Sequence, residues 1–460
     1  MCRRCFAERI STMKNVLQQV SAVAGHERRR LKILFANIPA DGHFNPLSSL
    51  AVHLQSVGHD VRWYTGPSYA EKVRQLGVPP YPFKKAKEVT VHNIDEVFPE
   101  RKHIRKHIRK INFDICNYFI LRAEEFFEDI KDINDSFDFD VLIADSAFTG
   151  ITLTRDKLGK HTVVVGVYPL QVSSRDLGPT IMGLPPFTSA FGKMAQRFLK
   201  WTVDNVLLRA PNQMMRRLHE KHGIDMGKTN LFDAQLRNAS LWLQSGAPCF
   251  EYRRSDLSRK IRYVGPLLPA AKRKGLELGF EEKIAQYKKL ILVTQGTFER
   301  DSKKLIVPAL EAFKNSEYLV VVTTAGANTE ALRKAYPYPN VIIEDFIPFD
   351  AIMPYADVFV SNGGYGGVMY SICHELPMVA GGIHEGKNEI CARVGHFKLG
   401  VNLRTERPSP RRLKAAVEKV LADESYRKNT AAMAKQFAQY RPEQLCARFV
   451  EELPSEHCRP

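Results

Sequence analysis

Residues 362–367, Asn-Gly-Gly-Tyr-Gly-Gly, are the part of this chain best suited to hold a charged ligand. The apolar run at residues 358–360 predicts a buried strand before them, and the run at 368–372 predicts a helix after them. A glycine turn that opens a helix lets backbone N–H groups approach a phosphate at the positive end of the helix dipole. The pattern therefore predicts a site for a nucleotide diphosphate. An ordinary tight strand-to-helix turn is the alternative, because glycine clusters are common.

A histidine near the start of the chain is the second candidate for chemistry. A predicted strand at residues 31–37 is followed by Gly-His-Phe-Asn-Pro at 42–46. We expect Asn45 to cap a helix over 47–57 and Pro46 to lie in its first turn. His43 would then lie in a loop at the carboxyl end of a strand, where open α/β sheets bind their ligands. For this histidine alone, a structural role at the helix start is the alternative.

The elements that must position these residues alternate between strand and helix through both halves of the chain. Predicted strands fall at 31–37, 60–64, 141–144 and 161–167, and then at 290–294, 318–323, 341–343, 358–360 and 377–380. Such alternation indicates parallel sheets with crossover helices. The predicted fold class is α/β, with two Rossmann-like, doubly wound domains facing a cleft. The predicted divisions are a basic extension (1–30), a first domain (31–266), a linker (267–285), a second domain (286–440) and a tail (441–460).

Five motifs, in their order along the chain, resemble those of the inverting glycosyltransferases that use nucleotide-sugar donors. The resemblance is closest to the bacterial branch that acts on macrolides and other small molecules. The motifs are GHFNPL from residue 42, DVLIADSAF from 140, VTQGT from 293, the stretch 344–367, and EGKNEICARVGHFKLGVNLRTERP from 385. The resemblance covers roughly residues 32–440. It implies the GT-B architecture, with the acceptor in the first domain and the donor in the second. It also implies that the last helices cross back onto the first domain.

The resemblance assigns catalytic roles in the first domain. It implies that His43 is the general base and that Asp145 orients its ring and stabilises the imidazolium. A helix cap is the alternative role for Asp145. Asp140 begins the same predicted strand, so we expect it at the opposite end, away from the cleft.

The resemblance also assigns the donor-binding residues of the second domain. They are Thr297, Phe346, Asn362, Gly363, Gly364, Tyr365, Gly366, Gly367, Glu385 and Lys387. Phe346 lies where many relatives stack tryptophan on the base, although a core aromatic is the alternative. Two positions depart from the family pattern. Tyr370 replaces a glutamate that grips the ribose, and Gly386 replaces an acidic residue that contacts the sugar.

Two long variable stretches, residues 89–138 and 173–231, are expected to carry acceptor specificity. Phe113, Tyr118 and Phe119 are the candidate acceptor-binding residues, and Phe126 is a further wall candidate, although at helical spacing such residues more often lie in a core. Acceptors are expected to be small and apolar.

Composition agrees with a large globular enzyme. The chain has 460 residues, of which 44% are hydrophobic, and no apolar run approaches the length of a membrane span. Eight scattered cysteines favour a reduced, cytoplasmic location. Cys2-Arg3-Arg4-Cys5 has a metal-like spacing but no second pair, so we expect neither a metal site nor a cofactor. The UDP- or dTDP-sugar would be a co-substrate.

The net charge of +17 is concentrated in places, above all in the repeat RKHIRKHIRK at residues 101–110. Ile104, Ile108 and Ile111 share one helical face, which predicts an amphipathic helix with a solvated cationic side. Attraction of an acidic acceptor, or peripheral contact with a membrane, is the alternative. No nucleic-acid-binding motif accompanies the charge.

The predicted function is transfer of a hexose from a UDP- or dTDP-sugar to a hydroxyl of a small apolar acceptor, with inversion and without a metal. A non-catalytic nucleotide-binding or nucleic-acid-binding protein on the same fold is the first alternative. A nucleotide-sugar epimerase of similar fold is the second, but such enzymes lack the pairing of the His43 motif with the glycine turn.

Overall fold

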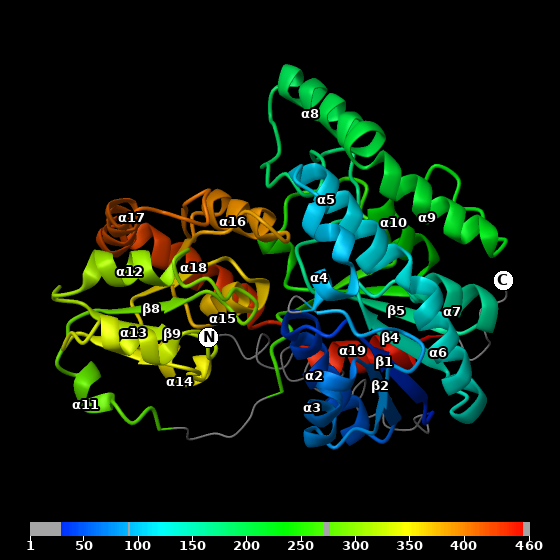
Figure 1. Ribbon diagram of the computed structural model, residues 1–460, viewed down its shortest axis with the longest axis horizontal. Helices are drawn as coiled ribbons and strands as arrows, with labels where there is room; N and C mark the ends of the chain where they lie inside the picture. Colours follow the sequence, from blue (N-terminus) through cyan, green and yellow to red (C-terminus); the bar gives the residue numbers. More distant parts are fainter. Residues whose placement is uncertain (1–28, 91–92, 271–276, 454–460) are drawn as a thin grey trace, which may run out of the picture.

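The computed structural model describes residues 29–90, 93–270 and 277–453. These residues form two α/β domains side by side, each built on one parallel sheet (Figure 1). The predicted fold class is therefore confirmed. The Cys2–Cys5 motif and parts of the predicted extension, linker and tail lie outside the described residues.

The first domain is built on a seven-stranded sheet of order β3-β2-β1-β4-β5-β6-β7. In spatial order the strands are β3 (Pro80–Pro82), β2 (Asp60–Thr65), β1 (Lys32–Ala36), β4 (Val141–Asp145), β5 (His161–Gly166), β6 (Leu241–Ser245) and β7 (Ile261–Gly265). Four of these strands match the prediction. The sequence did not predict β3, β6 and β7, because β3 holds two prolines and the other two lack long apolar runs.

The helices of this domain cover both faces of the sheet (Figure 1). The α-helices are α2 (Asp41–Ser56), α3 (Ala70–Gln75), α4 (Ile94–Val97), α5 (His107–Asp114), α6 (Arg122–Ser136), α7 (Ile151–Leu158), α8 (Ala190–Thr202), α9 (Arg209–Lys221) and α10 (Leu231–Asn238). Shorter turns are η2 (Pro67–Tyr69), η3 (Pro99–His103) and η6 (Pro248–Phe250), and two π-helical segments are η4 (Ile115–Ile120) and η5 (Val203–Leu207).

The start of helix α2 corrects the sequence prediction. The helix begins at Asp41 behind an extended Ala40, so His43 lies in its first turn and not in a loop. The backbone N–H groups of His43 and Phe44 both donate to the Ala40 carbonyl, at 3.0 and 2.9 Å. Asn45 is therefore inside the helix and is not its cap. Pro46 lies far enough into the helix to remove one internal hydrogen bond, which hid the true start from sequence analysis.

The basic repeat also differs from its prediction. Residues 101–110 do not form one helix, because the turn η3 ends at His103 and α5 starts only at His107. Arg101 does not lie on a solvent-exposed cationic face of a helix. Its guanidinium contacts the carboxylates of Asp95 and Asp114 at 2.6 Å each.

The second domain carries a six-stranded parallel sheet of order β10-β9-β8-β11-β12-β13. In spatial order the strands are β10 (Val341–Glu344), β9 (Leu319–Thr323), β8 (Leu290–Thr294), β11 (Val358–Ser361), β12 (Met378–Ala380) and β13 (Gly400–Asn402). Its helices are α11 (Glu281–Ile284), α12 (Ile306–Phe313), α13 (Thr329–Ala335), α14 (Phe349–Ile352), the turn η7 (Met353–Tyr355), α15 (Tyr365–Cys373), α16 (Lys387–His396), α17 (Pro410–Ala422) and α18 (Glu424–Phe437). The five predicted strands are present, and β13 was missed because its sequence, Gly-Val-Asn, holds a single apolar residue.

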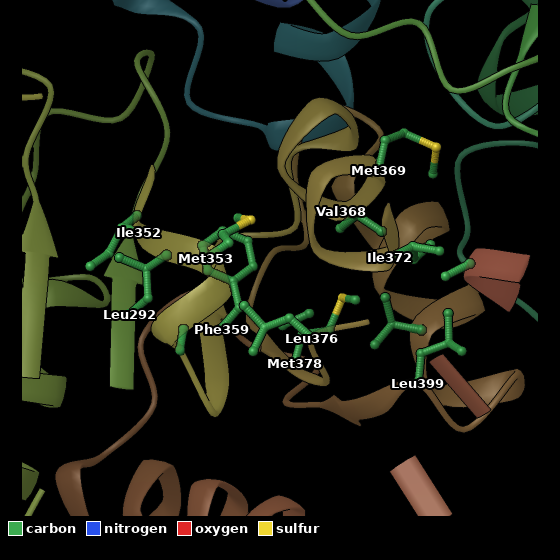
Figure 2. Packing of buried hydrophobic residues seen from close by; sticks show 14 of the residues in the cluster. Leu292, Ile352, Met353, Phe359, Val368, Met369, Ile372, Leu376, Met378 and Leu399 are labelled. Atoms are coloured by element: carbon green, nitrogen blue, oxygen red, sulfur yellow. The ribbon is translucent and has the colours of Figure 1, made fainter. Parts of the chain in front are cut away.

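The core of the second domain fixes the helix that follows the glycine turn. Figure 2 shows Val368, Met369 and Ile372 of α15 beside buried residues of the sheet and its loops, all of them in one hydrophobic cluster. Since this face of α15 is buried, its amino terminus is held at the carboxyl edge of the sheet.

The chain returns to the first domain at its end. Helix α19 (Pro442–Glu451) packs against α2, and its residues Cys446, Ala447 and Val450 are buried in the first-domain core. In both sheets the order reverses at the first strand, between β1 and β4 and between β8 and β11. Ligands of doubly wound sheets bind at that point, outside the carboxyl ends of the strands. Within the described residues, no helix is both long and apolar enough to cross a bilayer.

Candidate active site

His43 and Asp145 meet at the reversal point of the first sheet. His43 projects from the first turn of α2, and Asp145 is the last residue of β4. The His43 Nδ1 atom lies 2.7 Å from Asp145 Oδ1, and both side chains are buried. Because a carboxylate only accepts hydrogen bonds, Nδ1 carries the proton that is shared with it. The dyad that the resemblance implied is therefore assembled in the structure.

The backbone holds the Asp145 carboxylate rigidly. The Ile38 N–H donates to Oδ2 at 3.0 Å, and the Ala147 N–H donates to Oδ1 at 2.7 Å. Asp140, at the other end of the same strand, accepts the Lys32 N–H at 2.8 Å and so lies away from the dyad, as predicted. A buried carboxylate held by several donors can orient an imidazole ring.

Tyr168, which the sequence analysis did not select, completes the arrangement. It lies two residues beyond β5, and its hydroxyl is 2.8 Å from His43 Nε2. Burial, with help from the nearby Asp145 carboxylate, raises the pKa of Tyr168 well above its usual value. The phenol is therefore neutral and donates to Nε2. Nothing local in the sequence marks this residue, because the contact depends on β5 lying next to β4.

The second domain approaches Tyr168 through the loop before α16. A Cβ atom added to Gly386 would lie 3.9 Å from Tyr168 Cδ1 and 3.7 Å from Gln171 Nε2. The backbone of Gly386 has a φ of +77°, which favours glycine. The position where the resemblance implies an acidic residue thus lies close to Tyr168. Beside it, Glu385 accepts a hydrogen bond from Lys387 Nζ at 2.6 Å.

The glycine turn presents free backbone donors at the start of α15. Gly364 caps the helix without a side-chain hydrogen bond, and Tyr365, Gly366 and Gly367 are its first residues. A Cβ atom added to Gly366 would meet nothing within 4 Å, so this turn faces open space. Gly363 has a φ of +79°, and a Cβ there would collide with the Cys391 sulfur. The geometry suits an anion.

The other donor candidates gather near the same edge. The Asn362 side-chain amide donates to the Gln295 carbonyl, which joins the turns after β11 and β8. Thr297 is exposed in the β8 turn. Phe346, after β10, is 70% exposed, so it is not the core aromatic that sequence analysis left as an alternative. The Phe346 ring is free to stack on a base.

Two aromatic residues in this region have structural contacts. The Tyr365 ring is buried, and its hydroxyl donates to the Ser245 carbonyl of the first domain at 2.8 Å. Only its backbone N–H is open to a ligand. Tyr370 packs edge-on against Phe349, with ring centroids 5.5 Å apart. Its ring thus supports the core at the position where the resemblance implies a ribose-binding glutamate.

The acceptor candidates lie on the first domain above the dyad. Tyr118 lies close enough to Asp145 for the carboxylate, in addition to burial, to raise its pKa to about 12. Phe119 contacts Tyr118 edge-on at 4.6 Å, and Phe113 packs against Phe98 at 6.0 Å. Phe126 is not a wall residue. It is 3% exposed and stacks on Phe148 within the core.

A buried ionic network joins the two domains, and sequence analysis missed it. Arg393 of α16, 2% exposed, contacts Glu251 at 2.8 Å and Glu389 at 3.1 Å. Burial disfavours its charge, but the two carboxylates raise the pKa of Arg393 overall. The Glu251 carboxylate also accepts the Leu170 N–H, two residues from Tyr168, at 2.6 Å. Among the described residues, no cluster of His, Cys, Asp or Glu is arranged to hold a metal ion.

Comparisons with known proteins agree with this geometry. Residues 310–452 match the C-terminal domain of the erythromycin biosynthesis protein CIII-like family. The chain is 32% identical to 4'-demethylrebeccamycin synthase of Lentzea aerocolonigenes, over 88% of this chain and 96% of that protein. It is 28% identical to UDP-glycosyltransferase 2 of Phaeomoniella chlamydospora, over 92% and 95% of the two chains.

Solved structures share the fold. The kitacinnamycin glycotransferase superposes with a TM-score of 0.70 at 19% identity, covering 93% of this chain and all of that one. The glycosyltransferase VinC in complex with dTDP superposes with a TM-score of 0.65 at 16% identity, covering 92% and 100%. Together with the relatives in sequence, these likenesses establish that the chain belongs to the family of GT-B glycosyltransferases that includes the UDP-glycosyltransferases and the macrolide glycosyltransferases.

Proposed function

We propose that this glycosyltransferase moves a hexose from a uridine or thymidine diphosphate sugar to a hydroxyl of a small apolar acceptor. The reaction inverts the anomeric carbon, and His43 is its general base. The proposal rests on one observation, the hydrogen-bonded chain Asp145–His43–Tyr168. Glu385 and Gly386 of the other domain lie beside this chain.

The Tyr168 hydroxyl indicates where the acceptor reacts. It is a neutral hydroxyl at hydrogen-bond distance from an unprotonated nitrogen, which is the contact that a general base needs. An acceptor hydroxyl that takes this position gives its proton to Nε2 as its oxygen attacks the anomeric carbon. The positive charge that forms on the ring is stabilised by Asp145, 2.7 Å from Nδ1. Attack from this side displaces the diphosphate in line and inverts the centre.

The start of α15 supports the proposed donor site. Cleavage leaves a nucleoside diphosphate, whose growing charge must be stabilised. The uncapped N–H groups of Tyr365, Gly366 and Gly367 and the helix dipole can stabilise it without a metal ion. The exposed Phe346 ring is the proposed support for the base, and Glu385 and Lys387 are the proposed contacts to the sugar.

The region around Tyr118 supports an apolar acceptor. Tyr118 and Phe119 are half-buried aromatics near the dyad, on a π-helical segment. A non-catalytic nucleotide-binding protein remains the competing function. It would have no use for a buried histidine that is oriented by a carboxylate and already contacts a hydroxyl.

The test is turnover of the His43→Ala protein. The chain is incubated with UDP- and dTDP-hexoses and with phenolic or macrolide acceptors, and products are identified by mass and anomeric configuration. Loss of a general base should lower turnover by roughly two to four orders of magnitude. Binding of the diphosphate should change little, because His43 lies in the other domain. His53→Ala, in the last turn of the same helix, is the matched control.

Three results would refute the proposal. They are near-normal turnover of His43→Ala, retention of the anomeric configuration, and activity that disappears with a chelator and returns only with a divalent metal.

A further inference from the structure

Helix α8 exposes an apolar face that the proposed reaction does not use. Phe191, Met194, Phe198 and Trp201 are 76, 60, 67 and 57% exposed, and we call them the outer face of α8. Their spacing of three and four residues places them on one side of the helix. The Phe198 and Trp201 rings stack on each other at 6.4 Å. Four large exposed apolar side chains in one row form a patch that is rare on the surface of soluble monomeric proteins.

The outer face points away from the protein. The opposite side of the helix carries Gly192 and Gln196, which are buried, and Gln196 accepts a hydrogen bond from the Phe187 N–H. Helix α8 projects from the first domain at the top of the molecule (Figure 1). No described residue therefore covers the outer face.

Exposed cations lie on α8 beside this face and on the nearby basic repeat. On α8 itself, Lys193 and Arg197 are exposed, and Arg197 is followed directly by Phe198. The basic repeat adds Lys102, Arg105, Lys106 and Arg109, which are all exposed. Helix α5, which carries the end of the repeat, contacts the segment η5 that continues α8, because the Asn112 side chain donates to the Leu207 carbonyl at 2.8 Å. We call these six residues the cationic border.

The nearby acidic groups offset only part of the cationic border, although Glu96 and Glu100 are also exposed just before the repeat. Asp95 and Asp114 pair with Arg101, and Asp204 pairs with Lys200. Neither Arg101 nor Lys200 belongs to the border. A projecting helix with aromatic residues on one side and Lys and Arg beside them has the pattern of helices that lie in a membrane interface.

We propose that the outer face of α8 and its cationic border bind the surface of an anionic lipid bilayer. The aromatic side chains enter the interface and the cations contact the lipid phosphates. A second copy of the chain fits less well, because pairing two such faces would bring two cationic borders together. Bilayer binding is separate from the transfer reaction, so it does not depend on the proposed function.

Trp201 provides a direct readout. The chain has three tryptophans, all in the described residues, and Trp63 and Trp242 are buried. Trp201 is thus the one that solvent reaches. When the full chain is mixed with vesicles of phosphatidylglycerol and phosphatidylcholine, we expect its fluorescence to shift to shorter wavelength and the protein to sediment with the vesicles.

Two variants test the two parts of the surface. Phe191→Ser with Phe198→Ser keeps the Trp201 reporter and should abolish the shift. Changing Lys102, Arg105, Lys106 and Arg109 to Gln should weaken binding on the order of a hundredfold or more, since each cation contributes about one kcal/mol at an anionic surface. Control variants carry the same kinds of change on the second domain and should bind like the unchanged chain. They are Tyr355→Ser, and Arg411, Lys419, Lys428 and Lys435 to Gln.

The proposal is overturned if vesicles leave Trp201 fluorescence unchanged. It is also overturned if the controls weaken binding as much as the variants at α8 do. A third contrary result is a dimer that forms through the outer face in sedimentation velocity and persists with vesicles present.

Discussion

Among single residues, Tyr168 connects the proposed acceptor site to His43, the proposed general base. Its hydroxyl contacts His43 Nε2 at 2.8 Å, and its ring lies against Gly386 of the donor domain. An acceptor can reach Nε2 only after this hydrogen bond is broken. Under the proposed function, Tyr168 competes with the acceptor for Nε2 and takes no part in the proton transfer.

Replacing Tyr168 with phenylalanine should strengthen acceptor binding. A hydrogen bond of this kind contributes about 0.5–1.5 kcal/mol, so we expect KM for the acceptor to fall about 2- to 10-fold. The value of kcat should stay within about threefold, because His43 and Asp145 are untouched. Steady-state kinetics with the acceptor varied gives both constants. A fall in kcat of about a hundredfold would show instead that the phenol takes part in the chemistry.

His219 should make folding sensitive to acid. Its side chain is buried in α9, and Nδ1 donates to the Met215 carbonyl at 2.7 Å. Burial lowers the pKa of His219 from its usual 6.5, so the unfolded chain binds the proton more readily. The contribution of the neutral His219 side chain to stability is fully present above about pH 6.5. It is lost progressively as the pH drops below that value.

The measurement is the urea midpoint of unfolding as the pH falls from neutrality. His219 contributes a slope of up to about 1.4 kcal/mol per pH unit to the loss of stability below its unfolded-state pKa. The His219→Gln protein should show a shallower acid dependence than the unchanged chain, whatever its stability at neutral pH. Equal slopes for the two proteins would contradict this assignment.

Among the elements, the amino terminus of α15 is the proposed site for the diphosphate of the donor. Gly366 lies in its first turn and faces open space, so side chains fit there without moving the backbone. Gly366→Asp should abolish the rise in melting temperature that UDP or dTDP produces, because its carboxylate repels the phosphates. The fold should not suffer, since an acidic residue in a first turn stabilises a helix by about 0.3–1 kcal/mol.

Gly366→Ala is the matched control, because it adds volume without charge. It should keep most of the nucleotide-dependent shift, as measured by thermal unfolding at several nucleotide concentrations. If the aspartate variant still binds the nucleotide like the alanine variant, the diphosphate is held somewhere other than at α15.

In the whole molecule, the two domains are joined by a buried charge and not only by a linker. Arg393 belongs to α16 of the second domain, and Glu251 belongs to the loop after η6, before the first domain ends at β7. Removal of one member of a buried ion pair leaves the other without compensation. Arg393→Met should therefore lower the free energy of unfolding by about 3–5 kcal/mol.

Two further variants identify the cause of this loss. Adding Glu251→Gln to Arg393→Met should recover part of the stability, because one uncompensated carboxylate is removed. Arg407→Met, which breaks an exposed pair with Asp301, should change stability by less than about 1 kcal/mol. Denaturation in urea measures all three. If Arg393→Met and Arg407→Met have equal effects, the buried network does not hold the domains together.

The sequence by itself was enough to predict the fold class and to select most of the candidate site residues. Continuously apolar strands such as β1 and β8 indicate parallel sheets, since both faces of such strands are buried. His43, Asp145 and the turn at 362–367 each follow a predicted strand, so the edge on which they lie could be predicted. The exposure of the Phe346 ring could not be predicted, because burial depends on which residues pack over the ring.

The tertiary structure decided what depends on neighbours that are distant in the chain. Tyr168 reaches His43 because β5 lies next to β4, and Gly386 lies against Tyr168 because the two domains meet there. The start of α2 follows the extended backbone of Ala40, and the helix-start signals at Asn45 and Pro46 placed it too far along the chain. The pairing of Arg393 with Glu251 joins residues 142 positions apart. Hydrophobic periodicity shows which face of a helix or strand is buried. It does not show which other element packs against that face, and the contacts described here depend on that other element.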